Sequence, residues 1–297
     1  FSKLTNNPKH NLHYFDPKSI SFEIFLFFIL QVKYFQLKKM AKSLLIVCAL
    51  FLAVVASVTA APTPKKQLSF NLCKKNDPNL DKCLKTSIQS VIPDLAEGYP
   101  KLRIPAIEPF ELPSLEIDQG KGSSKSVSID LKLKDVKIMG LTSTVIDSLK
   151  FDVDNYKLNG KIGFTKPLEI TGQYTVNGKV LVLPITGNGP CTLVLHDPVL
   201  ELKEVSGSPS QKNGKTFVQI KKFELRLVSI KKLNVKLENL FNGNKQLGDS
   251  MNSILNENWE VLLEELKPAF EEAVGAIAQD IVNKALQKTA YSDIFPL

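Results

Sequence analysis

The chain has 297 residues, of which 38 are Lys or Arg and 30 are Asp or Glu, for a formal net charge of +8. Residues 1–60 hold seven of the basic and two of the acidic residues, which leaves a net charge of +3 in residues 61–297. So small an excess, spread along the chain, argues against a nucleic-acid-binding protein, which needs a concentrated basic surface. Residues 61–297 suffice for one elongated domain or two small ones.

Residues 40–60 have the pattern of a secretory signal peptide. Lys42 follows Met40, an apolar run covers 44–55, and small residues end the segment at Ala60. The alternative is a transmembrane anchor, which needs a longer apolar run of roughly 20 residues. We expect the signal to be cleaved and the protein to be secreted.

Residues 1–39 precede this signal, and we interpret them as an upstream leader that is not part of the fold. The alternative is a membrane-associated extension built on the apolar residues 24–30, a run that is too short to span a bilayer. Residues 61–297 are then predicted to form a single domain.

Three cysteines follow the signal peptide. Cys73 and Cys83 enclose nine residues, most of them polar and turn-forming, which in an oxidising compartment predicts a disulfide worth about 2–3 kcal/mol. A zinc site, the first alternative, needs more ligands than two thiols, and a redox site, the second, has CxxC spacing. Cys191 is predicted to be a buried free thiol, with an intermolecular bridge as the alternative.

The segment after Cys83 predicts a short helix and then extended chain. Leu84, Ile88 and Val91 recur at helical spacing, and Pro93 ends the run. The four prolines of the stretch GYPKLRIPAIEPFELPSLEI exclude a long helix there.

From residue 127 the apolar residues alternate with polar ones, as in VSIDLKLKDVKI, LKFDVD and KKLNVKLENL. One wet and one apolar face predict an antiparallel sheet of about seven strands, several of them long. Asn177-Gly178 predicts a hairpin turn that would pair Tyr174 with Leu181. A bulge or bend is expected near Lys221-Lys222, where the alternation in TFVQIKKFELRLVSI changes phase.

The last part of the chain predicts helix for about 40 residues from Leu247. Asp249 or Ser250 is expected to cap it, and Pro268 is expected to kink or split it. Apolar residues at spacings of three and four form one stripe, namely Met251, Leu255, Trp259, Leu262, Leu266, Phe270, Val274, Ile277 and Ile281. If this stripe packs against a curled sheet, the space between them could either be filled by side chains or remain as a cavity. Periodicity alone leaves both possibilities open.

An enzyme is not expected. The only histidine outside residues 1–60 is His196, so a Ser-His-Asp or Cys-His apparatus would have to use it. Cys191 and His196 are five residues apart, which in a strand puts them on opposite faces. No GxSxG, HExxH or P-loop pattern occurs, and no cofactor is indicated.

Residues 68–297 resemble the insect takeout / juvenile-hormone-binding protein family. The matching motifs are the Cys73/Cys83 pair followed by GYPKLRIPAIEPFELP, then GNGPC, NLFNGNKQLG, the NxNW that ends at Trp259, ELKP and the terminal FP. The resemblance implies an α+β fold in which a long C-terminal helix is wrapped by a highly curved antiparallel sheet that encloses an elongated hydrophobic tunnel. It also implies a disulfide between the two matching cysteines. Some hormone-binding members have a second bridge at Cys191, and the lack of a partner here resembles the takeout branch.

The resemblance further implies a carrier, expected here to be a monomer, that sequesters a terpenoid hormone, fatty acid or similar lipid. Specificity would come from a polar contact at one end of the tunnel, for which Tyr174 is the candidate, although it could equally be a core residue. The alternative function is membrane-surface or bacterial-lipid binding, with a weak membrane contact through lysines of the sheet's wet face. The predicted tunnel lining consists of Phe151, Val153, Tyr174, Val176, Leu181, Leu183, Phe223, Leu225, Met251, Leu255, Trp259 and Leu262.

Overall fold

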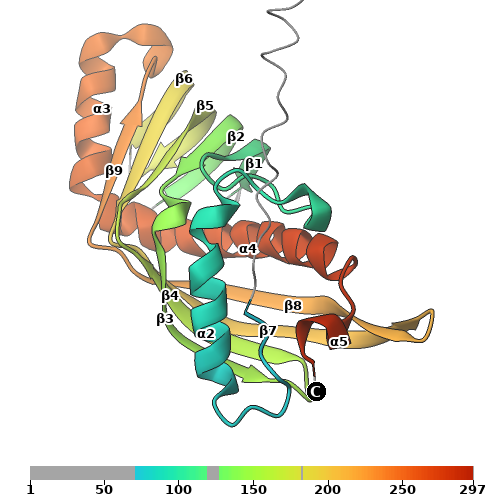
Figure 1. The fold of residues 1–297 in the computed structure, drawn as a ribbon. Coiled ribbons are helices and arrows are strands. Elements are labelled where there is room, and N and C mark those ends of the chain that lie inside the picture. Colours follow the sequence, from blue (N-terminus) through green and yellow to red (C-terminus); the bar gives the residue numbers. More distant parts are fainter. Residues whose placement is uncertain (1–70, 119–126, 182, 297) are drawn as a thin grey trace, which may run out of the picture. The chain divides into compact units, whose positions relative to one another are not determined.

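The computed structural model describes residues 71–118, 127–181 and 183–296 (Figure 1). The chain divides into two units, Phe1–Lys66 and Gln67–Leu297, and all described residues belong to the second. The predicted leader and signal peptide therefore lie outside the described residues. Of the helices in the described residues, none is long and apolar enough to cross a membrane.

One antiparallel sheet has five strands in the order β1-β2-β5-β6-β9. Alternation along β2 buries Ile129 and Leu133 and leaves Lys132 and Lys134 exposed, as predicted. A register shift against β5 follows Lys134, so that Val136 also becomes buried. The strands are β1 (Phe110–Asp118), β2 (Val127–Met139), β5 (Leu168–Val180), β6 (Leu183–His196) and β9 (Lys232–Leu237).

A second antiparallel sheet has four strands in the order β3-β4-β7-β8. They are β3 (Thr144–Asp152), β4 (Lys157–Phe164), β7 (Val199–Lys212) and β8 (Lys215–Ser229). The α+β class with a long C-terminal helix is thus confirmed. The described residues hold nine strands rather than about seven, and these strands form two sheets rather than one.

The hairpin predicted at Asn177-Gly178 is wrong. β5 continues through this dipeptide to Val180, which pairs with Leu183, and Tyr174 pairs with Gly189 rather than with Leu181. Glycine at position 178 instead allows β2 to approach β5 closely, because a Cβ there would lie 2.2 Å from the Ser128 carbonyl oxygen of β2.

The bulge expected near Lys221-Lys222 is confirmed. Ser206 pairs with Lys222 whereas Gly207 pairs with Ile220, so Lys221 has no partner on β7. The same two strands meet at Asn213-Gly214, where both residues have positive φ, as a two-residue hairpin turn requires.

The helices are α2 (Leu80–Val91), α3 (Lys245–Glu257), α4 (Trp259–Leu286) and α5 (Tyr291–Ile294). Short 3-10 turns occur at Pro93–Leu95, Pro100–Leu102, Leu141–Ser143 and Phe241–Gly243. The predicted cap at Asp249 or Ser250 is wrong, because the side chain of Asn244 accepts the hydrogen bond from the Leu247 amide at 3.1 Å.

Of the kink or split predicted at Pro268, the split is wrong. α3 ends before Asn258, whose side chain donates to the Ile254 carbonyl at 2.8 Å, and α4 begins at Trp259. α4 then runs through Pro268 without interruption. Pro268 and Glu264 are both exposed, so water can reach the carbonyl group that the proline leaves without a donor.

Helix α3 covers the open edge of the five-stranded sheet at β9. Asn256 accepts from the Val235 amide at 2.9 Å and donates to the carbonyl of the same residue. One helical turn earlier, Asn252 makes the equivalent pair of bonds with Leu237, at 2.9 Å each. These amides complete the hydrogen bonds that a further strand would otherwise make.

Candidate functional site

Helix α4 contacts strands of both sheets, β8 in one and β1, β2 and β9 in the other (Figure 1). A row of side chains four residues apart attaches it to the edge of β8. Glu271 accepts from the Leu227 amide at 2.7 Å, and Asn283 accepts from the Ile220 amide at 2.7 Å. Between them Gly275 is buried, and a Cβ there would lie only 2.9 Å from the Phe223 carbonyl oxygen. This row fixes both the rotation and the distance of the helix relative to β8.

One set of apolar residues of α4 lies on a different face of the helix from this row. At about 3.6 residues per turn, Phe270, Val274, Ile277 and Ile281 share another face, which begins at Leu266. We call these five residues the α4 stripe. Each of them is only half-buried. In this helix of 28 residues the buried residues are Leu262 and Gly275, so Leu262 is its one buried apolar side chain. A helix between two sheets would normally bury its apolar stripe, so the polypeptide leaves this one incompletely covered.

Two core clusters flank the α4 stripe. The first joins the five-stranded sheet to α3 and to Leu262 of α4. The other joins the four-stranded sheet to Val282 and Leu286 at the opposite end of α4. Phe270, Val274 and Ile277 belong to neither cluster. The apolar surface that could receive a ligand is therefore centred on the middle of α4.

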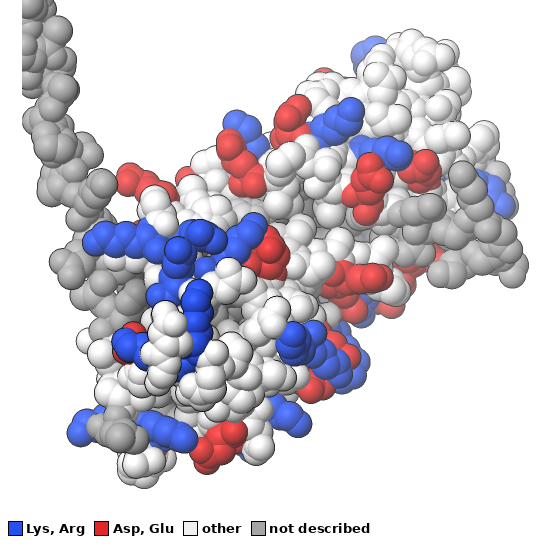
Figure 2. Space-filling model, turned by 90° about the vertical axis from the view of Figure 1, so that its right-hand side faces the viewer, with Lys and Arg blue, Asp and Glu red and all other residues white. Residues whose placement is uncertain are grey.

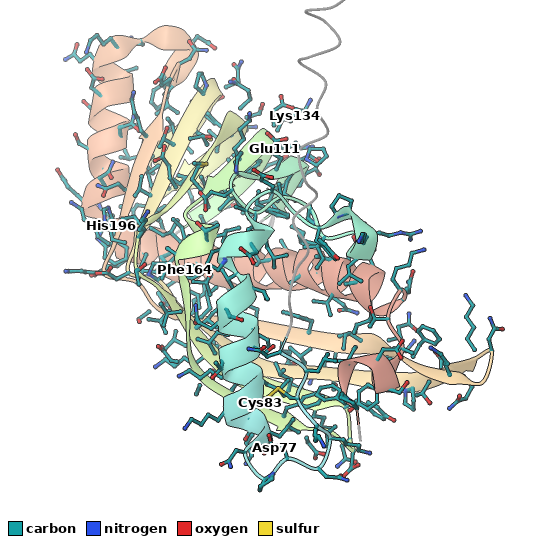
Figure 3. The ribbon with its side chains drawn as sticks, viewed as in Figure 1. Asp77, Cys83, Glu111, Lys134, Phe164 and His196 are labelled. Atoms are coloured by element: carbon teal, nitrogen blue, oxygen red, sulfur yellow. A yellow bond between two sulfur atoms is a disulfide. The ribbon has the colours of Figure 1, made fainter. Side chains whose placement is uncertain are left out.

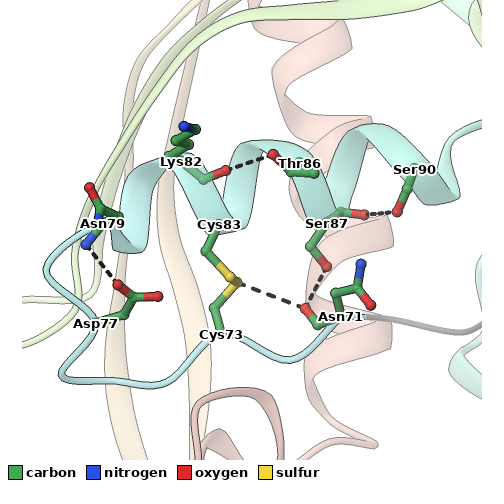
Figure 4. The surroundings of a disulfide bond; sticks show 9 residues. All are labelled: Asn71, Cys73, Asp77, Asn79, Lys82, Cys83, Thr86, Ser87 and Ser90. Atoms are coloured by element: carbon green, nitrogen blue, oxygen red, sulfur yellow. Dashed lines mark hydrogen bonds between the residues drawn. A yellow bond between two sulfur atoms is a disulfide. The ribbon is translucent and has the colours of Figure 1, made fainter.

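A third cluster lies around the disulfide, which is confirmed between Cys73 and Cys83 (Figure 4). Cys73 and Phe295 are both buried in it, and the Lys75 amide donates to the Pro296 carbonyl at 2.9 Å. The disulfide loop and the end of the chain are thus held together.

Aromatic residues extend this third cluster toward β3 and β4. Phe151 stacks on Phe295 with ring centres 5.1 Å apart, and Tyr291 lies 5.0 Å from Phe295 and 5.1 Å from Tyr156. The Tyr291 hydroxyl donates to the Val153 carbonyl at 2.6 Å. Burial raises the pKa of Tyr291 above its ordinary value, and the neighbouring Tyr156 adds to this.

The structure distributes the predicted tunnel residues among these clusters. Val176, Met251, Leu255 and Leu262 lie in the first cluster with Leu181 packed against it, Phe223 lies against the cluster at the far end of α4, and Phe151 and Val153 lie in the disulfide cluster. Leu225 is buried and Trp259 half-buried outside all three. Leu183 is 37% exposed at the start of β6, because the hairpin register that placed it inward is wrong.

Tyr174 is buried in the first cluster, where its hydroxyl donates to the Glu238 carbonyl at 2.7 Å. Burial, with a further effect of Cys191, raises the pKa of Tyr174 to about 12. Cys191 is a buried free thiol, as predicted, and burial also raises its pKa. The Tyr174 hydroxyl already has a protein partner, and its contact with a ligand stays a prediction.

Sequence reasoning missed some residues of the cluster at the end of α4. Leu158 of β4, Leu202 of β7, Tyr156 and Tyr291 pack against the same buried core as Val282 and Leu286 of α4. The alternation of Tyr156 and Leu158 signals an inward face, but it gives no indication that this face packs in one cluster with α4.

The histidine considered for catalysis and one open pocket both lie at strands of the five-stranded sheet. His196 is the last residue of β6 (Figure 3), and its Nε2 lies 2.9 Å from the side-chain amide oxygen of Asn234. The residues that the structure describes contain no group of three or more potential metal ligands. A separate, open pocket of about 350 Å³ is lined by Thr192, Val194, Asn234, Val235, Lys236 and Asn256, and none of these is a predicted tunnel residue.

Comparison with known proteins gives a consistent set of similarities. The family model described as haemolymph juvenile hormone binding protein (JHBP) matches residues 46–296. The circadian clock-controlled protein daywake of Drosophila melanogaster is 30% identical over 238 residues, which cover 79% of this chain and 88% of that protein. A candidate beta-carotene-binding protein of Schistocerca gregaria is 23% identical, over 74% of this chain and 86% of that protein. The crystal structure of Epiphyas postvittana Takeout 1 is similar with a TM-score of 0.64 and 29% identity, over 76% of this chain and 99% of that one.

Proposed function

Because the chain belongs to the haemolymph juvenile hormone binding protein family, we propose that it is a secreted carrier of a small hydrophobic molecule. The ligand would be a terpenoid, a fatty acid or a similar lipid, held in a chamber along the α4 stripe. The similarity to a candidate beta-carotene-binding protein supports an apolar ligand. The signal peptide predicted over residues 40–60 supports secretion.

The observation that carries this proposal is the incomplete burial of the α4 stripe. Phe270, Val274 and Ile277 belong to neither of the two core clusters and are only half-buried, so they offer apolar surface that a ligand would cover. Each methylene moved from water to such a surface contributes about 0.8 kcal/mol. A chain of about ten carbons would thus retain several kcal/mol after its ordering cost, which corresponds to about micromolar affinity or better.

The first test is the content of the purified protein. Native mass spectrometry of the secreted protein is expected to show an additional mass that is lost on denaturation and is extractable into organic solvent. After removal of the lipid, the protein is expected to take up a fluorescent long-chain fatty acid with saturation. A protein that carries no apolar molecule and takes up none would contradict the proposal.

The second test locates the chamber. Val274→Phe adds volume to the centre of the α4 stripe and is expected to weaken fatty-acid uptake by about 10-fold or more. Val261→Phe makes the same change on the same helix at a position that is 38% exposed, and is expected to leave uptake unchanged. Equal uptake by both variants, with unaltered thermal unfolding, would place the ligand elsewhere.

A further inference from the structure

The lysines on the outer faces of the sheets have acidic neighbours across the strands. Lys137 of β2 lies 3.2 Å from Glu111 of β1, and Lys222 of β8 lies 2.6 Å from Glu204 of β7. Lys203 is paired in the same way, 3.6 Å from Glu224. These ion pairs neutralise much of the positive charge on the wet face of the sheets. From the sequence, the lysines of this face are the ones expected to make the weak membrane contact of the alternative function.

Unbalanced positive charge gathers instead where three elements meet at the end of α4. Lys212 and Lys215 face each other across the β7–β8 turn, and every residue of this tip from 208 to 215 is exposed. Lys284 is exposed in the last turn of α4 and Lys288 just after it. Lys101 is exposed in the 3-10 turn that contacts α4, and Arg103 is exposed just after that turn. We call these six residues the basic face.

The hydrogen bonds and ion pairs place these elements side by side. The Asn283–Ile220 bond of 2.7 Å ties the last turns of α4 to β8, and Lys215 lies 3.5 Å from Asp293 of α5. Figure 2 looks onto the side of the molecule where Figure 1 shows the β7–β8 hairpin and α5, and Lys and Arg cluster there.

Few carboxylates balance this charge. Lys215 pairs with Asp293 and Lys284 pairs with Asp280. Among the residues that the structure describes, no carboxylate forms an ion pair with the other four, Lys101, Arg103, Lys212 and Lys288.

From this juxtaposition we propose that the basic face docks on an anionic phospholipid surface. The charges are spread over a projecting hairpin, a helix end and a turn, which suits a broad charged plane better than a compact anion. Each Lys or Arg near such a surface adds roughly a factor of five to the partition coefficient. The proposal does not require the carrier function, but a carrier docked in this way would have the end of α4 beside a source of hydrophobic ligands.

The test compares vesicles of pure phosphatidylcholine with vesicles that contain about 30% phosphatidylserine. The secreted protein is expected to co-sediment only with the anionic vesicles and to be released when the salt concentration rises to about 300 mM. Lys212→Glu with Lys288→Glu is expected to reduce this binding by about 10-fold or more.

The matched control is Lys134→Glu with Lys179→Glu, which changes the net charge equally on the five-stranded sheet and is expected to retain binding. Equal losses in the two double variants, or equal binding to neutral vesicles, would overturn the proposal. Binding to a soluble polyanion such as heparin without binding to vesicles would overturn it as well. Fatty-acid uptake in vesicle-free solution reports on the carrier function separately and is expected to be the same in all variants.

Discussion

Several side-chain amides in this protein take the place of a missing strand. Asn252 and Asn256 each bond to both backbone groups of a β9 residue, and Asn283 does the same for Ile220 of β8 with bonds of 2.7 and 3.0 Å. A primary amide matches the donor–acceptor pattern of a peptide group, so it completes an edge without adding another strand. The edges remain satisfied while the helices stay free to present apolar side chains elsewhere.

Asn256→Ala tests this role directly. It leaves the Val235 amide and carbonyl without their partner in a half-buried place, and we expect the free energy of unfolding to fall by about 1–3 kcal/mol. Urea denaturation monitored by circular dichroism measures this. Ser253→Ala, an exposed change on the same helix, is expected to alter the free energy by less than about 0.5 kcal/mol. Similar values for the two variants would show that the edge bonds contribute little.

Gly275 tests the approach of α4 to β8. Gly→Ala within a helix ordinarily gains up to about 1 kcal/mol. At Gly275, however, the new Cβ would lie 2.9 Å from the backbone oxygen of Phe223, so we expect Gly275→Ala to destabilise the protein by about 1–3 kcal/mol. At Gly248 of α3 the nearest atom, the Cβ of Leu240, is 3.7 Å away, so Gly248→Ala is expected to be neutral or stabilising. Thermal unfolding of the two variants should therefore shift in different directions, and parallel shifts would contradict the close packing.

Glu108 gives a prediction about pH. Burial by itself would raise the pKa of this carboxyl, but the amides of Gly140 and Thr142 and the Thr142 hydroxyl all donate to it, and its pKa is lowered from 4.5. A lowered folded pKa contributes stability that is complete above the unfolded value and is lost as the pH falls through the folded value. The difference in unfolding free energy between wild type and Glu108→Gln should be largest at neutral pH and shrink below about pH 4.5. The exposed Glu97→Gln serves as the control variant, and a Glu108→Gln effect that does not change with pH would refute the assignment.

At the scale of the elements, local patterns were sufficient where local chemistry decides the outcome. Alternation located β2, β3 and β9, and a phase change located the bulge at Lys221. Local patterns were insufficient where pairing with a strand distant in the sequence decides the local structure. Two of the Asn-Gly dipeptides in the sequence, at 177–178 and at 213–214, show the contrast. Only the second forms the turn of a hairpin, because β5 continues through the first and pairs with β2 there, with Ile129 opposite Gly178. Likewise the break between α3 and α4 occurs at Asn258, where a side chain competes with the backbone, rather than at the exposed proline.

The disulfide is predicted to act on two elements, α2 and the end of the chain. Replacing Cys73 and Cys83 by Ser should cost about 2–3 kcal/mol for a loop of this length. Because Lys75 bonds to Pro296 and Phe295 packs on Cys73, the C-terminal residues should also become accessible. Carboxypeptidase digestion under native conditions is expected to remove them faster from the double variant, with Lys150→Ala, an exposed change on β3, as the control. If the loss of stability occurs without faster digestion, the disulfide stabilises α2 alone.

For the whole molecule, the apolar character of the site could be read from the sequence, but its position could not. The α4 stripe follows from spacing alone, and Phe270, Val274 and Ile277 already belong to it. Which of its members stay half-buried depends on how two sheets, built from interleaved strands, meet the same helix. That arrangement arises from pairings between residues far apart in the chain, such as Cys191 with Leu237, which no local pattern specifies.

The last prediction concerns the coupling between the two sheets. α4 is attached to β8 by Asn283 and contacts β1, β2 and β9, so a ligand on its stripe would be enclosed by elements of both sheets. Ligand that binds only the folded state at about 100 times its Kd should add about 2.7 kcal/mol to the free energy of unfolding. Hydrogen exchange by mass spectrometry should then show slower exchange in peptides from both β8 and β9 when fatty acid is added. The disulfide loop between Cys73 and Cys83, whose apolar cluster contains no residue of α4, serves as the internal control for a non-specific effect. Protection confined to one sheet would place the ligand in a surface groove of that sheet rather than between the two.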